Sequence, residues 1–268
     1  MFIRKKKSFH WYNYYIMGLL LSGLLGLLAG FLVNYLSDVL PVKRSLEKPG
    51  CKGCGADYSW KNYLLLTTCP NCAAARSWRT YISLGAGILI SMALWLSPPL
   101  RMGYWLGLLV ITYFAVVIVI DLEHRLILHM VSLAGAPLGL LTGIIRYNLV
   151  DSLLGGLAGL GIMLIFYWFG TLFARFRSRK LGHDDGEEAL GFGDVTISTV
   201  LGLMLGWPLI IYGLMIGILL GGFFSLGIVL FLVVTKRYQT MSIYTAYGPY
   251  LVFGAIIIMY FPKLLSNL

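Results

Sequence analysis

Long segments without a charged residue alternate with short charged segments along this chain. Six of the apolar segments each match the ~20 residues that a helix needs to cross a bilayer. A seventh, Val195–Thr235, is long enough for two helices, and Gly and Pro interrupt it near Gly206-Trp207-Pro208 or in the Gly213 region. The pattern therefore predicts about eight transmembrane helices. The six single segments are Tyr14–Leu36, Thr80–Leu100, Met102–Ile120, Leu126–Ile145, Ser152–Ala174 and Tyr238–Pro262.

The composition excludes a soluble domain, because 59% of the 268 residues are hydrophobic and only 12% are charged. We therefore expect an all-α polytopic membrane protein. Three parts are predicted: a tail with the first transmembrane helix (residues 1–36), a hydrophilic loop domain (residues 37–79) and a seven-helix membrane domain (residues 80–268).

Most of the 21 Lys and Arg residues fall in loops on one side of the predicted bundle, which places that side in the cytoplasm. The basic segment Arg4–Lys7 opposes this orientation, because eight helices put it on the outer side. The net charge of +10 suits an inner surface that faces anionic lipid headgroups. The bilayer is thus an expected partner. Nucleic acid is not, because no basic segment is interleaved with stacking aromatic residues.

All four cysteines lie in the predicted loop domain, as Cys51-x-x-Cys54 and Cys69-x-x-Cys72 with 14 residues between the pairs. This spacing is typical of a four-cysteine zinc site, which is structural because no coordination position is left for water. Two disulfides or a redox-active dithiol are the alternatives. A reducing cytoplasm disfavours disulfides, and neither pair follows a thioredoxin-like strand pattern.

Two aspartates, Asp121 and Asp194, lie where an apolar segment meets a charged loop. A carboxylate at the edge of the hydrocarbon is costly unless it is paired, solvated or used. Two such groups on one face could share a proton and activate water. Asp194 follows Gly191 and Gly193, which would permit close backbone approach or unusual dihedral angles. The alternative interpretation is that Asp194 only caps a helix.

The other acidic residues have structural interpretations. Asp38 is expected to cap its helix or to pair with Lys43 or Arg44, and Asp151 to cap the start of a helix. Glu123 has Arg125 as a nearby partner. The remainder are expected to be solvated surface charges: Glu47, Asp57, Asp184, Asp185, Glu187 and Glu188. His124 and His129 flank the Asp121 segment. Each could be solvated among the lipid headgroups or act as a general base, and both interpretations stay open.

Several segments together resemble the prepilin peptidases, membrane aspartic proteases that process type IV pilin-like precursors. Glu188–Val195 is similar to the GxGD segment of that family, and Asp121 stands where the family has its other catalytic aspartate. Further similar segments are Gly30–Asn34 with Pro41, the two CxxC pairs, Ser77–Arg79, Leu205–Trp207 and Tyr247–Leu251 with Gly254.

The resemblance implies that Asp121 and Asp194 are catalytic, with support from Gly191 and Gly193. It implies cleavage of prepilin or pseudopilin leaders at the cytoplasmic face of the bacterial inner membrane, and pilus or secretion assembly proteins as partners. In most bacterial members, S-adenosylmethionine then supplies a methyl group to the new amino terminus. Methyl transfer stays open here, because the chain departs from the family pattern at Leu84, Leu128-His129 and Thr196.

A transporter or channel that uses Asp121 and Asp194 to carry protons or cations is the alternative function. It requires an ionisable residue near the middle of the membrane, and no apolar segment contains Asp, Glu, Lys or Arg. A purely structural membrane scaffold is the third interpretation. It leaves the Asp121 segment and the GxGD segment unexplained.

Overall fold

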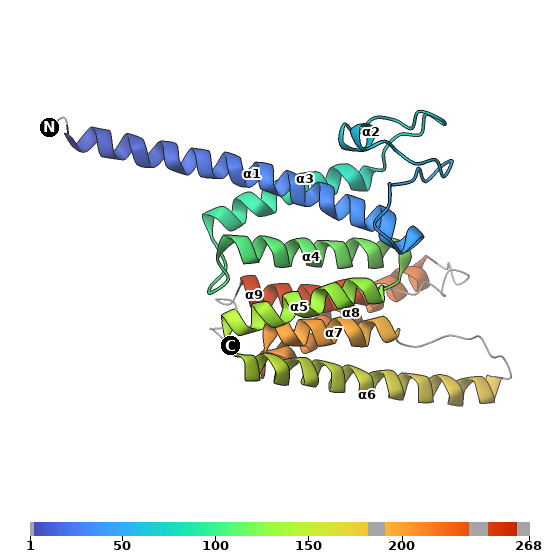
Figure 1. Ribbon diagram of the computed structural model, residues 1–268. Helices are drawn as coiled ribbons and strands as arrows, with labels where there is room; N and C mark the ends of the chain where they lie inside the picture. The colour runs from blue at the N-terminus through green and yellow to red at the C-terminus, as the bar shows by residue number, and fades with distance from the viewer. Residues whose placement is uncertain (1–2, 182–190, 236–245, 262–268) are drawn as a thin grey trace. The chain divides into compact units, whose positions relative to one another are not determined.

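The computed structural model describes residues 3–181, 191–235 and 246–261. Glu187, Glu188 and Asn267, with the rest of residues 182–190 and 262–268, lie outside these ranges, as do residues 236–245. In the described ranges the regular secondary structure is helical, with one isolated bridge between Gly50 and Asp57. The helices are α1 (Ile3–Lys43), α2 (Trp60–Leu64), α3 (Trp78–Leu96), α4 (Gly103–His124), α5 (His129–Arg146), α6 (Leu149–Leu181), α7 (Phe192–Leu205), α8 (Leu209–Val234) and α9 (Gly248–Tyr260) (Figure 1).

The predicted all-α membrane fold is confirmed. Six helices in the described residues are long and apolar enough to cross a membrane, namely α1, α3, α4, α5, α6 and α8. The helices α7 and α9 are apolar but shorter, and they complete the eight apolar segments of the prediction. The segment Val195–Thr235 breaks at Gly206-Trp207-Pro208, the first of the two expected positions, where Gly206 has a φ of 72°.

Some helices extend beyond the apolar segments that predicted them. The helix α1 continues through Asp38 and Pro41 to Lys43. Asp38 is tolerated in this extension because Arg79 and the Tyr63 hydroxyl neutralise and solvate its carboxylate. The first predicted boundary, at residue 36, therefore falls inside a continuous helix.

The chain forms two compact units, residues 1–116 and 117–268. In the first unit α1 packs along α3, and the glycines Gly26 and Gly87 let the two backbones approach closely. The Ser91 hydroxyl donates a hydrogen bond to the Ser22 carbonyl (2.6 Å) and shares another with the Tyr104 hydroxyl (2.8 Å). These polar contacts hold the helices of this unit together where apolar attraction is weak.

In the second unit α7 lies between α5 and α6 and also contacts α8 and α9 (Figure 1). Gly155 on α6 and Gly202 on α7 meet backbone to backbone, and Ser152 donates a hydrogen bond to the Leu203 carbonyl (2.8 Å). Nine residues of α7, including Asp194, are buried. The central position of α7 is what carries Asp194 into the interior of the unit.

Candidate active site and cysteine cluster

Asp121 lies in the last turn of α4, and only 4% of its surface is exposed. The backbone N–H of Gly248, at the start of α9, is within hydrogen-bonding range of its carboxylate. The buried Oδ2 atom nevertheless has no partner with full hydrogen-bond geometry among the described residues. A buried carboxylate oxygen without a full partner is costly and is therefore a candidate for chemistry.

Asp194 is the third residue of α7 and is 8% exposed. The helix cap is Gly191, which provides no side chain for capping, and the Gly191 backbone N–H is within range of the Asp194 carboxylate. That contact is the second half of a capping box, so the capping interpretation of Asp194 has a geometric basis. Capping alone does not account for the burial, because capping carboxylates are stable in water.

The two aspartates are close enough for their charges to interact, although α4 and α7 are separated by two helices in the sequence. No ion pair of the described residues includes either carboxylate. The structure thus brings together two buried acids without a basic partner in the described residues. When two acids interact electrostatically, ionisation of one favours protonation of the other, so such a pair can supply an acid and a base together.

The glycines of the GxGD segment differ in what they do. A Cβ atom on Gly193 would lie 2.7 Å from the Cβ atom of Ile127, so Gly193 is needed for close approach. Gly191 has more room, since its nearest neighbour would be the Asp194 Oδ2 atom at 3.8 Å. Neither glycine has a positive φ, so the expected unusual dihedral angles are absent from both.

Sequence reasoning did not assign a role to residues 247 and 248, which border this site. A Cβ atom on Gly248 would lie 2.6 Å from Asp121 Oδ2 and 3.1 Å from Ile127 Cδ1. The adjacent Tyr247 is within electrostatic range of Asp194. The signal for this segment was the resemblance of Tyr247–Leu251 to a segment of the prepilin peptidases, which did not indicate contact with Asp121.

The roles predicted for Asp151, Glu123 and His129 can be compared with their contacts. Asn148 caps α6 by accepting a hydrogen bond from the Asp151 N–H (2.7 Å), and Asp151 Oδ2 accepts one from the Asn148 amide (2.6 Å). Asp151 is therefore the second member of a capping pair rather than the cap. Glu123 lies 3.9 Å from His124 Nε2, and the His129 ring contacts the Phe192 ring at 6.3 Å between centroids.

The four cysteines form one cluster, in which all Sγ atoms lie within 4.8 Å of one another. The Cys51–Cys72 and Cys54–Cys69 Sγ pairs are each 3.6 Å apart, and all four thiols are free. A disulfide bond is ~2.05 Å long, so neither pair is at bonding distance. Four sulfurs bound to one zinc ion at ~2.3 Å would be about 3.8 Å apart, close to the observed spacing.

The two cysteine turns are built alike. In the first, the Cys51 N–H donates to the Ala56 carbonyl and the Gly55 N–H to the Cys51 carbonyl. In the second, Cys69 N–H donates to Ala74 and Ala73 N–H to Cys69. The backbone N–H groups of Cys54 and Gly53 lower the pKa of the Cys51 thiol to about 6. This favours the thiolate, which is the form that binds metal.

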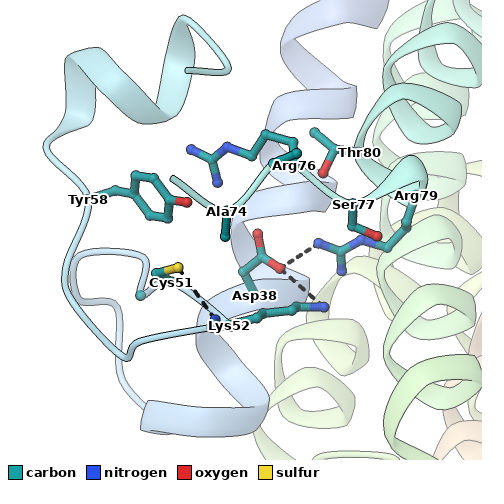
Figure 2. Close-up of a pocket in the computed structure, with 12 residues that line it drawn as sticks. Asp38, Cys51, Lys52, Tyr58, Ala74, Arg76, Ser77, Arg79 and Thr80 are labelled. Carbon is teal, nitrogen blue, oxygen red and sulfur yellow. Dashed lines mark hydrogen bonds and ion pairs between the residues drawn. The ribbon is translucent and has the colours of Figure 1, made fainter. Parts of the chain in front are cut away.

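A cavity of about 150 Å³ lies beside the cluster, between the cysteine turns and the start of α3 (Figure 2). Asp38 lines it and pairs with Arg79 and Lys52, while its Oδ2 atom accepts a hydrogen bond from Tyr63 (2.8 Å). The expected partners Lys43 and Arg44 were wrong, and Lys43 pairs with Asp57 instead. Through these contacts, Asp38 of α1 holds together the loop residues Lys52 and Tyr63 and the start of α3.

Comparison with known proteins agrees with these features. The sequence profile of the type IV leader peptidase family matches residues 108–226. The matched range makes up less than half of the chain. The matched range contains both Asp121 and the GxGD segment, and it ends before Gly248.

Three relatives share the name prepilin leader peptidase/N-methyltransferase. The protein from Aeromonas hydrophila is 29% identical over 136 residues, which is 49% of this chain and 41% of that protein. A relative from Aeromonas salmonicida is 28% identical over 49% of this chain and 40% of its own length. The Pectobacterium carotovorum protein is 27% identical over 61% of this chain and 52% of its own length. The chain thus spans about half or less of these relatives. No solved structure matches it.

Proposed function

We propose that this protein is a membrane aspartic endopeptidase that removes the leader from prepilin-like or pseudopilin-like precursors. The observation that carries the proposal is the buried pair Asp121 and Asp194, brought together from two helices inside the segment that matches the leader peptidase family. Residues 80–268 would form the peptidase domain, with Gly191 and Gly193 supporting the catalytic pair. The transporter alternative has no support in the comparisons.

The proposed chemistry is attack of water on the scissile carbonyl carbon. One aspartate accepts the proton of the water, while the other, protonated, donates a hydrogen bond to the carbonyl oxygen. When the C–N bond breaks, the leaving amine takes a proton from the pair, so the proton count is restored. The pair titrates as one unit, and neither acid is assigned the resting proton. The reaction requires no covalent intermediate.

The cysteine cluster supports a structural zinc site held by Cys51, Cys54, Cys69 and Cys72. The geometry fits a tetrahedral ion, and a closed four-thiolate site leaves no position for substrate. Its contribution would be folding energy for a loop domain with only a small core of Cys51, Tyr58, Tyr63 and Cys69.

Methyl transfer from S-adenosylmethionine is left open and is not part of the proposal. The cavity beside the cysteine cluster has a volume of about 150 Å³. Sites for small-molecule ligands usually measure about 300–1,000 Å³, so this cavity does not fit the whole cofactor. No step of methyl transfer is derived from it.

The proposed location is the bacterial inner membrane, with the active site and the cysteine loop facing the cytoplasm. This orientation rests on the basic loops on that side. The proposed partners are the apolar helices of the precursors, the surrounding lipid, and assembly proteins of a pilus or secretion system.

The test is cleavage of a pilin-like precursor by the purified protein in detergent or liposomes. Asp121→Asn and Asp194→Asn should each lower the rate at least ~100-fold, because Asn cannot exchange a proton. The double variant should be no slower than either single one, since the two acids act together. Asp151→Asn is the matched control and should cleave normally, at a stability cost of about 0.3–1 kcal/mol for the loss of a negative charge in the first turn of α6. Near-normal cleavage by Asp121→Asn would reject the two-aspartate mechanism, and Glu123 would be tested next.

A further inference from the structure

The start of α9 reaches both carboxylates of the proposed active site through two adjacent residues. Tyr247 is within electrostatic range of Asp194, and Gly248 is in direct contact with Asp121. This segment lies beyond residues 108–226, so the family match does not cover it. It is also far in sequence from both acids, and the fold alone brings it to them.

Gly248 is required for space rather than for its dihedral angles. It is buried, and its φ is not among the positive values of the described residues. An alanine would therefore fit the backbone conformation. Its Cβ atom, however, would lie 2.6 Å from Asp121 Oδ2, a distance at which the carboxylate must move. The Asp121 carboxylate thus occupies the space that a side chain at position 248 would need.

Gly248 also has a backbone donor to spare. The first N–H groups of a helix have no partner within the helix. In α9, Pro249 has no N–H, and the Tyr250 N–H donates to the Tyr247 carbonyl (3.1 Å). The Gly248 N–H lies near the Asp121 carboxylate, although the Oδ2 atom has no partner with full hydrogen-bond geometry among the described residues. The positive end of the helix dipole favours a carboxylate at this point.

We propose that Gly248 is a positioning residue for Asp121. Its N–H orients the Asp121 carboxylate, and its missing side chain leaves space for the Oδ2 atom. The carboxylate is thereby held in the orientation in which it can exchange a proton beside Asp194. The inference rests on the proposed function. It makes the start of α9 part of the active site, together with the end of α4 and the start of α7.

The first experiment measures kcat, KM and the pH profile of precursor cleavage for Gly248→Ala. We expect kcat to fall about 100-fold, the usual effect of a ~1 Å misplacement of a reacting group, with KM changed less than about threefold. The pH optimum should also shift, because the added methyl group displaces the Asp121 carboxylate from its position beside the Gly248 N–H and relative to Asp194. Gly222→Ala is the matched control, since in the described part of the chain nothing beyond its neighbours in the sequence and the backbone of its own helix lies within 4 Å of the added methyl group. It should behave as the unsubstituted protein.

A second control separates positioning from helix packing. A Cβ atom on Gly254, also in α9, would meet the Gly213 carbonyl of α8. Gly254→Ala should therefore lower the amount of folded protein while the remaining enzyme keeps the normal pH profile. If Gly248→Ala shows that same pattern, or cleaves as fast as Gly222→Ala, the positioning role is wrong.

A third measurement does not depend on activity or on the alanine variant folding. Oxidation of Asp121→Cys/Gly248→Cys should form a disulfide between positions 121 and 248, detected by peptide mass spectrometry. Asp121→Cys/Gly222→Cys should not form one. Absence of the 121–248 bond would overturn the inference. Failure of the proposed function would give a different result from failure of this inference. In that case the unsubstituted protein would not cleave the precursor, or Asp121→Asn would remain active.

Discussion

Asp38 should be the polar side chain that most strongly holds the base of the cysteine loop, because it pairs α1 with Arg79 of α3 and accepts a hydrogen bond from Tyr63 of the loop. Its side chain is 12% exposed, accepts a hydrogen bond from Tyr63, and pairs with the 14%-exposed side chain of Arg79. Removing one member of a buried ion pair costs about 3–5 kcal/mol. Because both side chains keep some contact with solvent, we expect about 3 kcal/mol for Asp38→Asn. At ~1.4 kcal/mol per tenfold change, the population of molecules in which the loop has opened together with its base at α1 and α3 should rise about 100-fold.

Limited trypsin digestion after Lys61 reports this population, since Lys61 lies in α2 of the loop and cleavage of a rapidly opening segment follows the fraction that is open. Asp38→Asn leaves every trypsin site intact. The matched control is Asp57→Asn, which removes the exposed pair with Lys43 and should hardly change the rate. Arg79→Gln added to Asp38→Asn should restore part of the protection, because no unbalanced charge remains. Equal digestion rates for Asp38→Asn and Asp57→Asn would refute the reasoning.

Two further predictions concern the same loop and its side of the membrane. Elemental analysis of anaerobically purified protein should find one zinc ion per chain, and peptide mapping should find no disulfide; a metal-free preparation or a mapped Cys51–Cys54 disulfide would contradict the zinc site. Cysteine labelling should reach Ser59→Cys and Glu187→Cys from the cytoplasm, and Tyr147→Cys and Asn267→Cys from outside. Labelling of position 59 only from outside would reverse the proposed orientation.

The features that the sequence predicted are local ones. Apolar segments identify helices because each helix satisfies its own backbone hydrogen bonds inside the membrane. The CxxC pairs predicted a cluster because each pair forms its own turn, as Cys51 and Cys69 do with the same backbone bonds. The break before Leu209 was predicted for the same reason, since Gly206 and Pro208 act on their own neighbours.

Contacts between distant segments could not be predicted in this way. Asp38 had two basic residues within reach along its own segment, yet it pairs with Arg79, 41 residues away. Sequence proximity favoured Lys43, but α1 continues as a helix there, and Lys43 meets Asp57 instead. The contact between Gly248 and Asp121 likewise depends on how α9 packs in its unit. A single glycine in an apolar segment does not indicate which side chain needs its space.

The length of α7 connects this packing to the proposed chemistry. Its 14 residues rise about 21 Å, less than the ~30 Å of a bilayer core, so α7 is too short to cross the core by itself. The far end is followed by Trp207, a residue type common at membrane interfaces, and its backbone is held by a hydrogen bond from the Trp207 N–H to the Asp151 carbonyl (2.9 Å). If the Trp207 end lies at one interface, the Asp194 end falls short of the other and is recessed. A recessed, buried acid is poorly placed for a surface charge and well placed to meet a peptide bond beside a membrane helix. The short helix is therefore consistent with a protease whose substrate is itself anchored in the bilayer.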